Sequence, residues 1–166
     1  MTGAGEAMDL EWTEGVFGGD VRLRLAASAS GIRSVAFHPP AAEGRGGAAR
    51  NPLLKEAVRQ LHAYFAGDLR EFDLPLDMRG TEFQLSVWRQ LVSIPYGQTT
   101  SYAYIARAIG REKAVRAVGA ANGANPVAIV VPCHRVIGSS GRLVGYGGGL
   151  PLKQRLLQLE QGGLFS

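Results

Sequence analysis

Hydrophobic and polar residues alternate over two short stretches near the start of the chain. Residues Val21 to Leu25 follow a period of two, and Ile32 to Phe37 come directly after a Ser30-Gly31 pair typical of a turn. This pattern predicts a β-hairpin. Residues 39–50 are rich in proline and glycine and have no apolar period, so we expect an exposed, mobile loop there.

A helix is predicted after this loop. Asn51 and Pro52 suit the N-cap and first position of a helix, and Gly67 suits its end. Apolar residues recur between them on one helical face: Leu54, Ala57, Val58, Leu61 and Phe65. The segment that follows alternates again and is predicted to be extended, with its apolar positions at Phe72, Leu74, Leu76 and Met78.

The second half of the chain is predicted to consist mostly of short helices. Thr81 and Gln84 have the spacing of a capping box, and the apolar stripe behind them ends near Ile94. Two helices then follow closely, at residues 102–109 and from Lys113 to about residue 121, separated by a turn with glycine. Two short helices across such a turn indicate a helix-turn-helix.

An apolar run leads from these helices to the part of the chain that carries the chemistry. Val127 to Val131 fits a buried strand, after which comes Pro132-Cys133-His134-Arg135. A glycine-rich loop follows, and Pro151 starts a last helix that ends near Glu160.

Charge divides the chain into two unequal halves. Residues 1–80 contain 9 Lys/Arg and 11 Asp/Glu, a net charge of −2, whereas residues 81–166 contain 9 against 3, a net charge of +6. We therefore predict a mixed N-terminal domain over residues 1–78 and a helical domain over residues 79–166. A basic half favours a polyanionic partner such as nucleic acid, although a basic surface is more often only solvated.

The single cysteine among the 166 residues excludes an internal disulfide. It also excludes a zinc site built on thiolates, because there is no second thiol and the three histidines are scattered along the sequence. We therefore predict no metal and no cofactor. The N-terminus lacks the features of a signal peptide, and no run approaches the roughly 18 apolar residues of a membrane span. We expect a soluble cytoplasmic protein that does not bind membranes.

Cys133 needs a helper if it is to react. The thiolate is the nucleophilic form, and a cysteine beside an apolar segment has a raised pKa unless a base or a positive charge compensates. His134 is adjacent, and a sharp turn or a bridging water would connect the two side chains. Glu160 opposes the dipole of the last helix, which would be explained if it oriented His134. The simpler interpretation is a solvated glutamate at a frayed helix end.

Six sequence strings in this order closely resemble the 6-O-methylguanine-DNA methyltransferases. They are Ile94-Pro95-Tyr96-Gly97, Ser101-Tyr102, Arg116-Ala117-Val118-Gly119, Asn125-Pro126, Pro132-Cys133-His134-Arg135-Val136-Ile137-Gly138 and Gly145-Tyr146-Gly147-Gly148-Gly149. The resemblance is highly specific over residues 81–160 and weaker over residues 1–70. It implies an α/β (α+β) protein with a small ribonuclease-H-like N-terminal domain and a mainly helical C-terminal domain that carries the helix-turn-helix.

The resemblance also implies a set of catalytic residues. Cys133 would accept an alkyl group from guanine, and His134 and Glu160 would activate it through a water. Tyr102 would assist at N3 of the base and contact DNA. Some family members hold zinc in the N-terminal domain, but this sequence lacks the cysteines for it.

Further residues would bind DNA and shape the pocket. Arg116 would fill the space left by the flipped nucleotide, and Arg111 and Ser139 would contact the phosphate backbone. Asn125 would tie the active-site turn to the helix-turn-helix. The pocket wall would include Val136, and Tyr146 with Gly147 would close over the base.

The resulting hypothesis is a monomeric repair protein that acts once on double-stranded DNA carrying O6-alkylguanine. A thioether on Cys133 has no good leaving group, so the transfer would be stoichiometric and irreversible. Two alternatives come from other classes. A non-catalytic helix-turn-helix regulator would explain the basic half but not the Pro-Cys-His-Arg motif, and a cysteine hydrolase would release its product and turn over.

Overall fold

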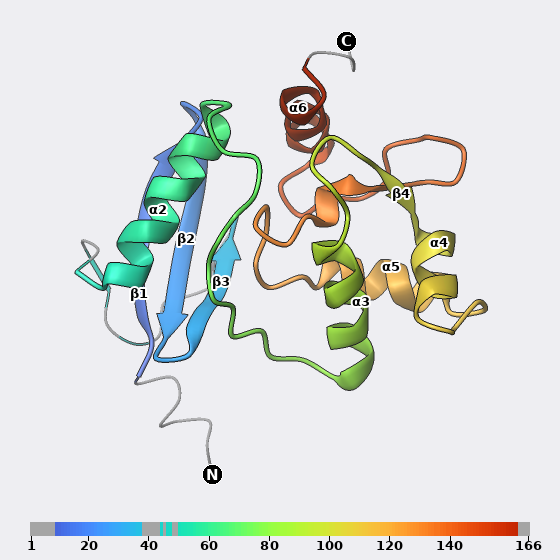
Figure 1. Ribbon diagram of the computed structural model, residues 1–166, viewed down its shortest axis with the longest axis horizontal. Helices are drawn as coiled ribbons and strands as arrows, with labels where there is room; N and C mark the ends of the chain where they lie inside the picture. The colour runs from blue at the N-terminus through green and yellow to red at the C-terminus, as the bar shows by residue number, and fades with distance from the viewer. Residues whose placement is uncertain (1–8, 38–43, 45, 48–49, 163–166) are drawn as a thin grey trace. The chain divides into compact units, whose positions relative to one another are not determined.

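The computed structural model describes residues 9–37, 44, 46, 47 and 50–162, so most of the predicted 39–50 loop lies outside the described residues. The chain separates into two compact units, Met1–Arg79 and Gly80–Ser166 (Figure 1). The first unit combines a small sheet with a helix, and the second is mainly helical, which confirms the predicted mixed α/β fold. The assignment of folding domains to residues 1–78 and 79–166 stays a prediction.

A three-stranded antiparallel sheet forms the first unit, in the order β1 (Glu11–Phe17), β2 (Val21–Ser28) and β3 (Gly31–Ala36). Figure 1 shows α2 (Pro52–Phe65) lying across one face of this sheet. Alternate residues of β2 are buried, as the period of two requires: Val21, Leu23, Leu25 and Ala27. The β2–β3 hairpin is therefore confirmed, and β1 is an additional strand that the apolar pattern did not reveal.

Local capping defines α2. The Asn51 side chain accepts hydrogen bonds from the backbone N–H groups of Leu53 and Leu54, and Gly67 follows the helix with a φ of 81°. The buried Gln60 then holds the next segment, because its amide group both donates to and accepts from the backbone of Asp73.

The predicted extended segment lies beside β3. Ile32 donates its backbone N–H to the Pro75 carbonyl at 2.8 Å and accepts from the Asp77 N–H at 2.9 Å. The Asp77 carboxylate accepts hydrogen bonds from Arg79, Ser28 and Arg33, which hold its pKa at about 2 although burial alone would raise it. These contacts hold residues 75–77 against the sheet.

The second unit begins with α3 (Glu82–Val92), whose predicted capping box between Thr81 and Gln84 is complete. The helix-turn-helix is formed by α4 (Tyr102–Ala108) and α5 (Val115–Gly123). The buried Trp88 of α3 donates its indole N–H to the Ala121 carbonyl of α5 at 2.8 Å. Each of the three helices α3, α4 and α5 contacts the other two, so they share one core.

Four further elements complete the second unit and carry the site. The short parallel strands β4 (Thr100–Ser101) and β5 (Val136–Ile137) pair with each other. The 3₁₀ helix η1 (Cys133–Arg135) precedes β5, and α6 (Leu150–Glu160) packs against η1. Within the part of the chain that the structure describes, no helix is long and apolar enough to cross a membrane.

Two predictions for this unit were wrong in detail. Val127 to Val131 does not form a strand but a tight buried turn, in which Ile129 has a φ of 71°. The Asn125 side chain closes the turn by accepting from the Val127 N–H and donating to the Val131 carbonyl. The second helix of the helix-turn-helix begins at Val115 rather than Lys113, because the residues before it form a turn.

Candidate active site

Cys133 lies at the start of η1 and is 7% exposed. Its backbone N–H donates to the Val131 carbonyl at 2.8 Å, so the turn that contains Ile129 fixes its position. Burial raises the pKa of the thiol, and hydrogen bonding by Asn125 and the charge of Lys153 offset part of this rise. The sulfur atom is thus shielded from water, and ionisation depends on its neighbours.

His134, the residue that follows Cys133, forms a buried pair with Glu160. Their side chains are fully buried, and His134 Nε2 lies 2.7 Å from Glu160 Oε2. Burial alone would raise the pKa of Glu160, but hydrogen bonds from His134 and Arg135 outweigh it and hold the pKa at about 2. Glu160 does not lie solvated at a frayed helix end, so that interpretation of the sequence is wrong.

The ionised carboxylate determines which imidazole nitrogen carries the proton. A carboxylate can only accept, so Nε2 of His134 is the donor and Nδ1 keeps its lone pair in the neutral ring. Nδ1 is buried and has no hydrogen-bond partner among the described residues. Burial lowers the pKa of His134, with Glu160 opposing, so the ring is neutral and able to accept a proton at Nδ1.

Arg135 completes this network, although the sequence analysis gave it no role. Its Nε donates to Glu160 Oε1 at 2.7 Å, and Nη2 donates to Oε2 at 3.0 Å. Nη1 donates to the Ile94 carbonyl at 2.7 Å. The guanidinium group therefore balances the buried carboxylate and fixes its orientation toward His134.

Two side chains approach the thiol region from the helix-turn-helix. Tyr102 is half-buried at the start of α4, and its hydroxyl donates to the Val144 carbonyl at 3.3 Å. Burial, followed by the negative charge of Cys133, raises the pKa of Tyr102, so the hydroxyl stays protonated as a donor. Asn122 of α5, which the sequence analysis missed, is buried and donates to the Cys133 carbonyl at 3.4 Å.

The predicted pocket residues, and Ser139, which was predicted to contact phosphate, lie at different depths. Val136 is fully buried in β5, and the Tyr146 ring lies 6.4 Å from the His134 ring, edge to face. Gly147 and Ser139 lie exposed in the glycine-rich loop, which we define as residues 138–149. The structure therefore brings Tyr146 close to the His134–Glu160 pair and leaves Ser139 at the surface.

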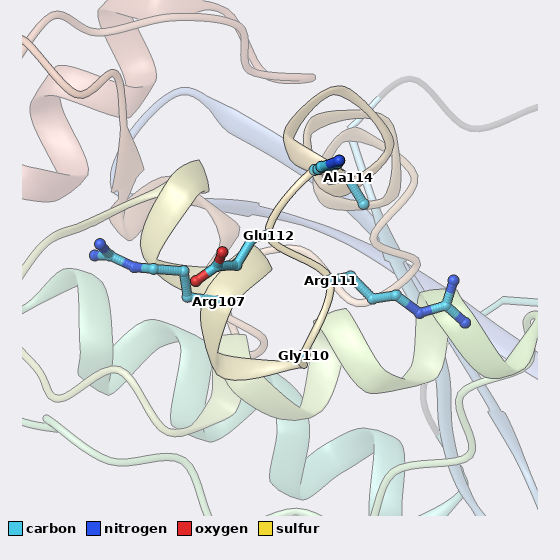
Figure 2. Close-up of a pocket in the computed structure, with 6 residues that line it drawn as sticks. Arg107, Gly110, Arg111, Glu112 and Ala114 are labelled. Atoms are coloured by element: carbon cyan, nitrogen blue, oxygen red, sulfur yellow. The ribbon is translucent and has the colours of Figure 1, made fainter.

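A basic surface surrounds the turn of the helix-turn-helix. Arg107, Arg111, Lys113 and Arg116 are all exposed, with Glu112 as the acidic residue among them. The turn lines an open cleft, and Figure 2 shows the Arg107 and Arg111 side chains extending in opposite directions from it. Exposed cations on both sides of a turn suit contacts with a phosphate backbone.

Comparisons with known proteins agree with this geometry. Residues 82–162 match the family model described as the 6-O-methylguanine DNA methyltransferase DNA binding domain, and residues 22–78 match that of its ribonuclease-like domain. A methylated-DNA--protein-cysteine methyltransferase from Mycolicibacterium paratuberculosis is 68% identical over 105 residues, which cover 63% of this chain and 64% of that protein. One from Methanosarcina acetivorans is 60% identical over 65% of this chain and 69% of its own length. The alignments thus span about two thirds of these relatives.

A solved structure gives a broader match. The crystal structure of Mycobacterium tuberculosis OGT in complex with DNA superposes with a TM-score of 0.83 at 46% sequence identity. The match covers 92% of this chain and 94% of that one. Both units of the present chain therefore have counterparts in a protein that binds DNA.

Proposed function

The chain belongs to the 6-O-methylguanine-DNA methyltransferase family, and on that premise we propose that it repairs O6-alkylguanine in DNA by moving the alkyl group onto Cys133. The observation that carries the proposal is a buried thiol beside a buried His134–Glu160 pair whose imidazole has a proton-accepting nitrogen. Alkyl transfer to a cysteine requires such a nucleophile.

The proton follows a short path in this proposal. The thiol gives its proton through one water to Nδ1 of His134, and Glu160 stabilises the imidazolium that forms. Arg135 keeps Glu160 ionised and fixed throughout. The thiol proton therefore ends on His134, and the thiolate is ready for attack.

Transfer is a displacement at the alkyl carbon. The sulfur–carbon bond forms while the bond between that carbon and O6 breaks, and the electron pair leaves with guanine. The Tyr102 hydroxyl donates a proton or a hydrogen bond at N3 and stabilises the departing base. The product is a thioether. Water cannot displace its sulfur from the alkyl carbon, so each chain reacts once.

Access to the base requires the nucleotide to leave the duplex. In our proposal the exposed Arg116 occupies the space left in the stack, and small exposed residues of α5 such as Ala117 and Ala120 let the helix approach a widened minor groove. Arg111 and Ser139 contact phosphates, and Val136, Tyr146 and Gly147 line the pocket, with Asn125 holding the active-site turn. We propose that the protein acts as a monomer in the cytoplasm.

Intact-mass spectrometry tests the proposal directly. After incubation with excess duplex that carries O6-methylguanine, the protein should gain one methylene, and peptide mapping should place it on Cys133. Release of more than one equivalent of product would instead support a hydrolase. An unmodified protein that still binds the duplex would support the non-catalytic regulator, which the exposed cations of the helix-turn-helix also fit.

A further inference from the structure

Lys153 of α6 is fully buried, which is unusual for a lysine. Its ammonium group donates three hydrogen bonds, to the carbonyls of Val136 at 2.6 Å, Val144 at 2.9 Å and Gly145 at 3.3 Å. These three acceptors match the three N–H donors of an ammonium group. The side chain is therefore held in one place by the backbone of two separate segments.

The two segments are parts of the proposed active site. Val136 belongs to β5, three residues after Cys133, whereas Val144 and Gly145 belong to the glycine-rich loop and directly precede Tyr146. The Val144 carbonyl also accepts from the Tyr102 hydroxyl. Lys153 thus connects the strand behind the thiol, the loop that carries Tyr146 and, through Val144, the start of α4.

The charge of Lys153 is balanced by no carboxylate among the described residues. The Glu160 carboxylate accepts hydrogen bonds from His134 and Arg135, so its negative charge is already balanced by Arg135. The other titratable groups that face the thiol are Tyr102 and Tyr146, both neutral because burial raises their pKa values. Lys153 is consequently the buried cation left to interact with a thiolate, and each of the two groups favours the charged form of the other.

We propose that Lys153 is a positioning residue for alkyl transfer, an inference that rests on the proposed function. Its ammonium group holds Val144 and Gly145 against β5, so that Tyr146 stays over the pocket, and it supplies the positive charge that balances the Cys133 thiolate. Burying a charged amine without a carboxylate is unfavourable for folding. Such an arrangement is explained when a second charge, the thiolate, arises nearby during the reaction.

The charge effect is tested with Lys153→Met, which keeps the length of the side chain and removes the ammonium group. The rate of transfer from free benzylated guanine is measured against pH, with the exposed Lys55→Met as the matched control. We expect the midpoint of the Lys153→Met profile to move to higher pH, with a rate at pH 7 about tenfold lower for each pH unit of that move. The difference between the two rates should narrow at high pH, where the thiol ionises without help, and what remains of it measures the lost loop contact. An unchanged midpoint would overturn the charge effect.

The loop contact is tested by amide hydrogen exchange of residues 138–149, which needs no substrate. Both Lys153→Met and Lys153→Arg should exchange faster than the parent, because neither side chain can satisfy three converging carbonyls. Lys153→Arg keeps the charge and should keep the midpoint of the pH profile close to that of the parent. Protection equal to the parent in both variants would refute the loop contact.

Two arms separate failure of this inference from failure of the proposed function. A parent protein that does not react with benzylated guanine would contradict the proposed function, and hydrogen exchange would still test whether Lys153 holds the loop.

If Lys153→Met does not fold, nitrogen NMR of the Lys153 ammonium group in the parent replaces it. We expect a slowly exchanging signal, assigned by its loss in Lys153→Arg, that shifts when Cys133 is alkylated. A rapidly exchanging signal that does not shift when Cys133 is alkylated would overturn the proposal.

Discussion

Replacing Glu160 by glutamine should weaken both the stability of the second unit and the reactivity of its thiol. Glutamine has nearly the same shape but no charge. It leaves the buried Arg135 without its counter-ion, and it no longer forces the proton of His134 onto Nε2. The two consequences have separate readouts, so one variant tests the network twice.

The lowered pKa of Glu160 gives the expected size of the loss in folding free energy. Its value falls from 4.5 to about 2 in the folded protein, which corresponds to about 3 kcal/mol of folding free energy. Because the folded-state pKa is the lower one, this stability is fully present above pH 4.5 and is lost as the pH falls toward 2. The Glu160→Gln variant should therefore be less stable than the parent by about 3 kcal/mol at pH 7, and the difference should disappear near pH 2.

Urea unfolding followed by circular dichroism between pH 2 and 7 measures the stability difference. The transfer rate from benzylated guanine at pH 7 should fall by about 10² to 10⁴, the usual contribution of a positioned acid–base pair. Asp77→Asn is the matched control, because Asp77 has a similarly lowered pKa but lies in the first unit. It should lose stability and keep the transfer rate. A Glu160→Gln protein with the stability and rate of the parent would refute the reasoning.

Three further substitutions have distinct expected outcomes. Cys133→Ala should abolish transfer but bind methylated duplex about as tightly as the parent in a fluorescence-anisotropy titration, because phosphate contacts dominate affinity; loss of binding would make Cys133 structural. Arg116→Ala should slow repair of duplex DNA far more than reaction with free benzylated guanine, and equal slowing in the two assays would exclude the role in base flipping. Thr81→Ala should lower the free energy of unfolding by about 1 kcal/mol, since it removes the capping box of α3, and an unchanged urea midpoint would contradict that assignment.

The helix starts could be predicted from the sequence because capping is local. Asn51 and Thr81 each accept a hydrogen bond from a backbone N–H two or three residues further on, as their positions before apolar periodic segments predicted, and Ser101 does the same for α4. The partners lie within one turn, so no tertiary contact is needed to identify them. The single cysteine beside a histidine likewise identified the centre of the proposed site.

Features that depend on distant packing escaped prediction. All of the run from Val127 to Val131 except Val130 is buried, but hydrophobicity indicates burial and not backbone conformation. The Asn125 side chain closes this run into a turn. Strand β1 was missed because Gly15 and charged residues interrupt its alternation. Arg135 and Lys153 are visible as basic residues, but their partners lie on segments that only the fold brings together.

The two tryptophans of the chain fall one in each unit, which gives each unit its own optical reporter. Trp12 lies in β1 under the guanidinium group of Arg24, 4.7 Å from the ring centroid. Trp88 is buried between α3 and α5, with its indole N–H bound to a carbonyl near the end of the helix that carries Arg116. In a Trp12→Phe background, the emission of Trp88 would follow the second unit alone. Its wavelength would report whether water reaches the α3–α5 interface when that helix engages DNA.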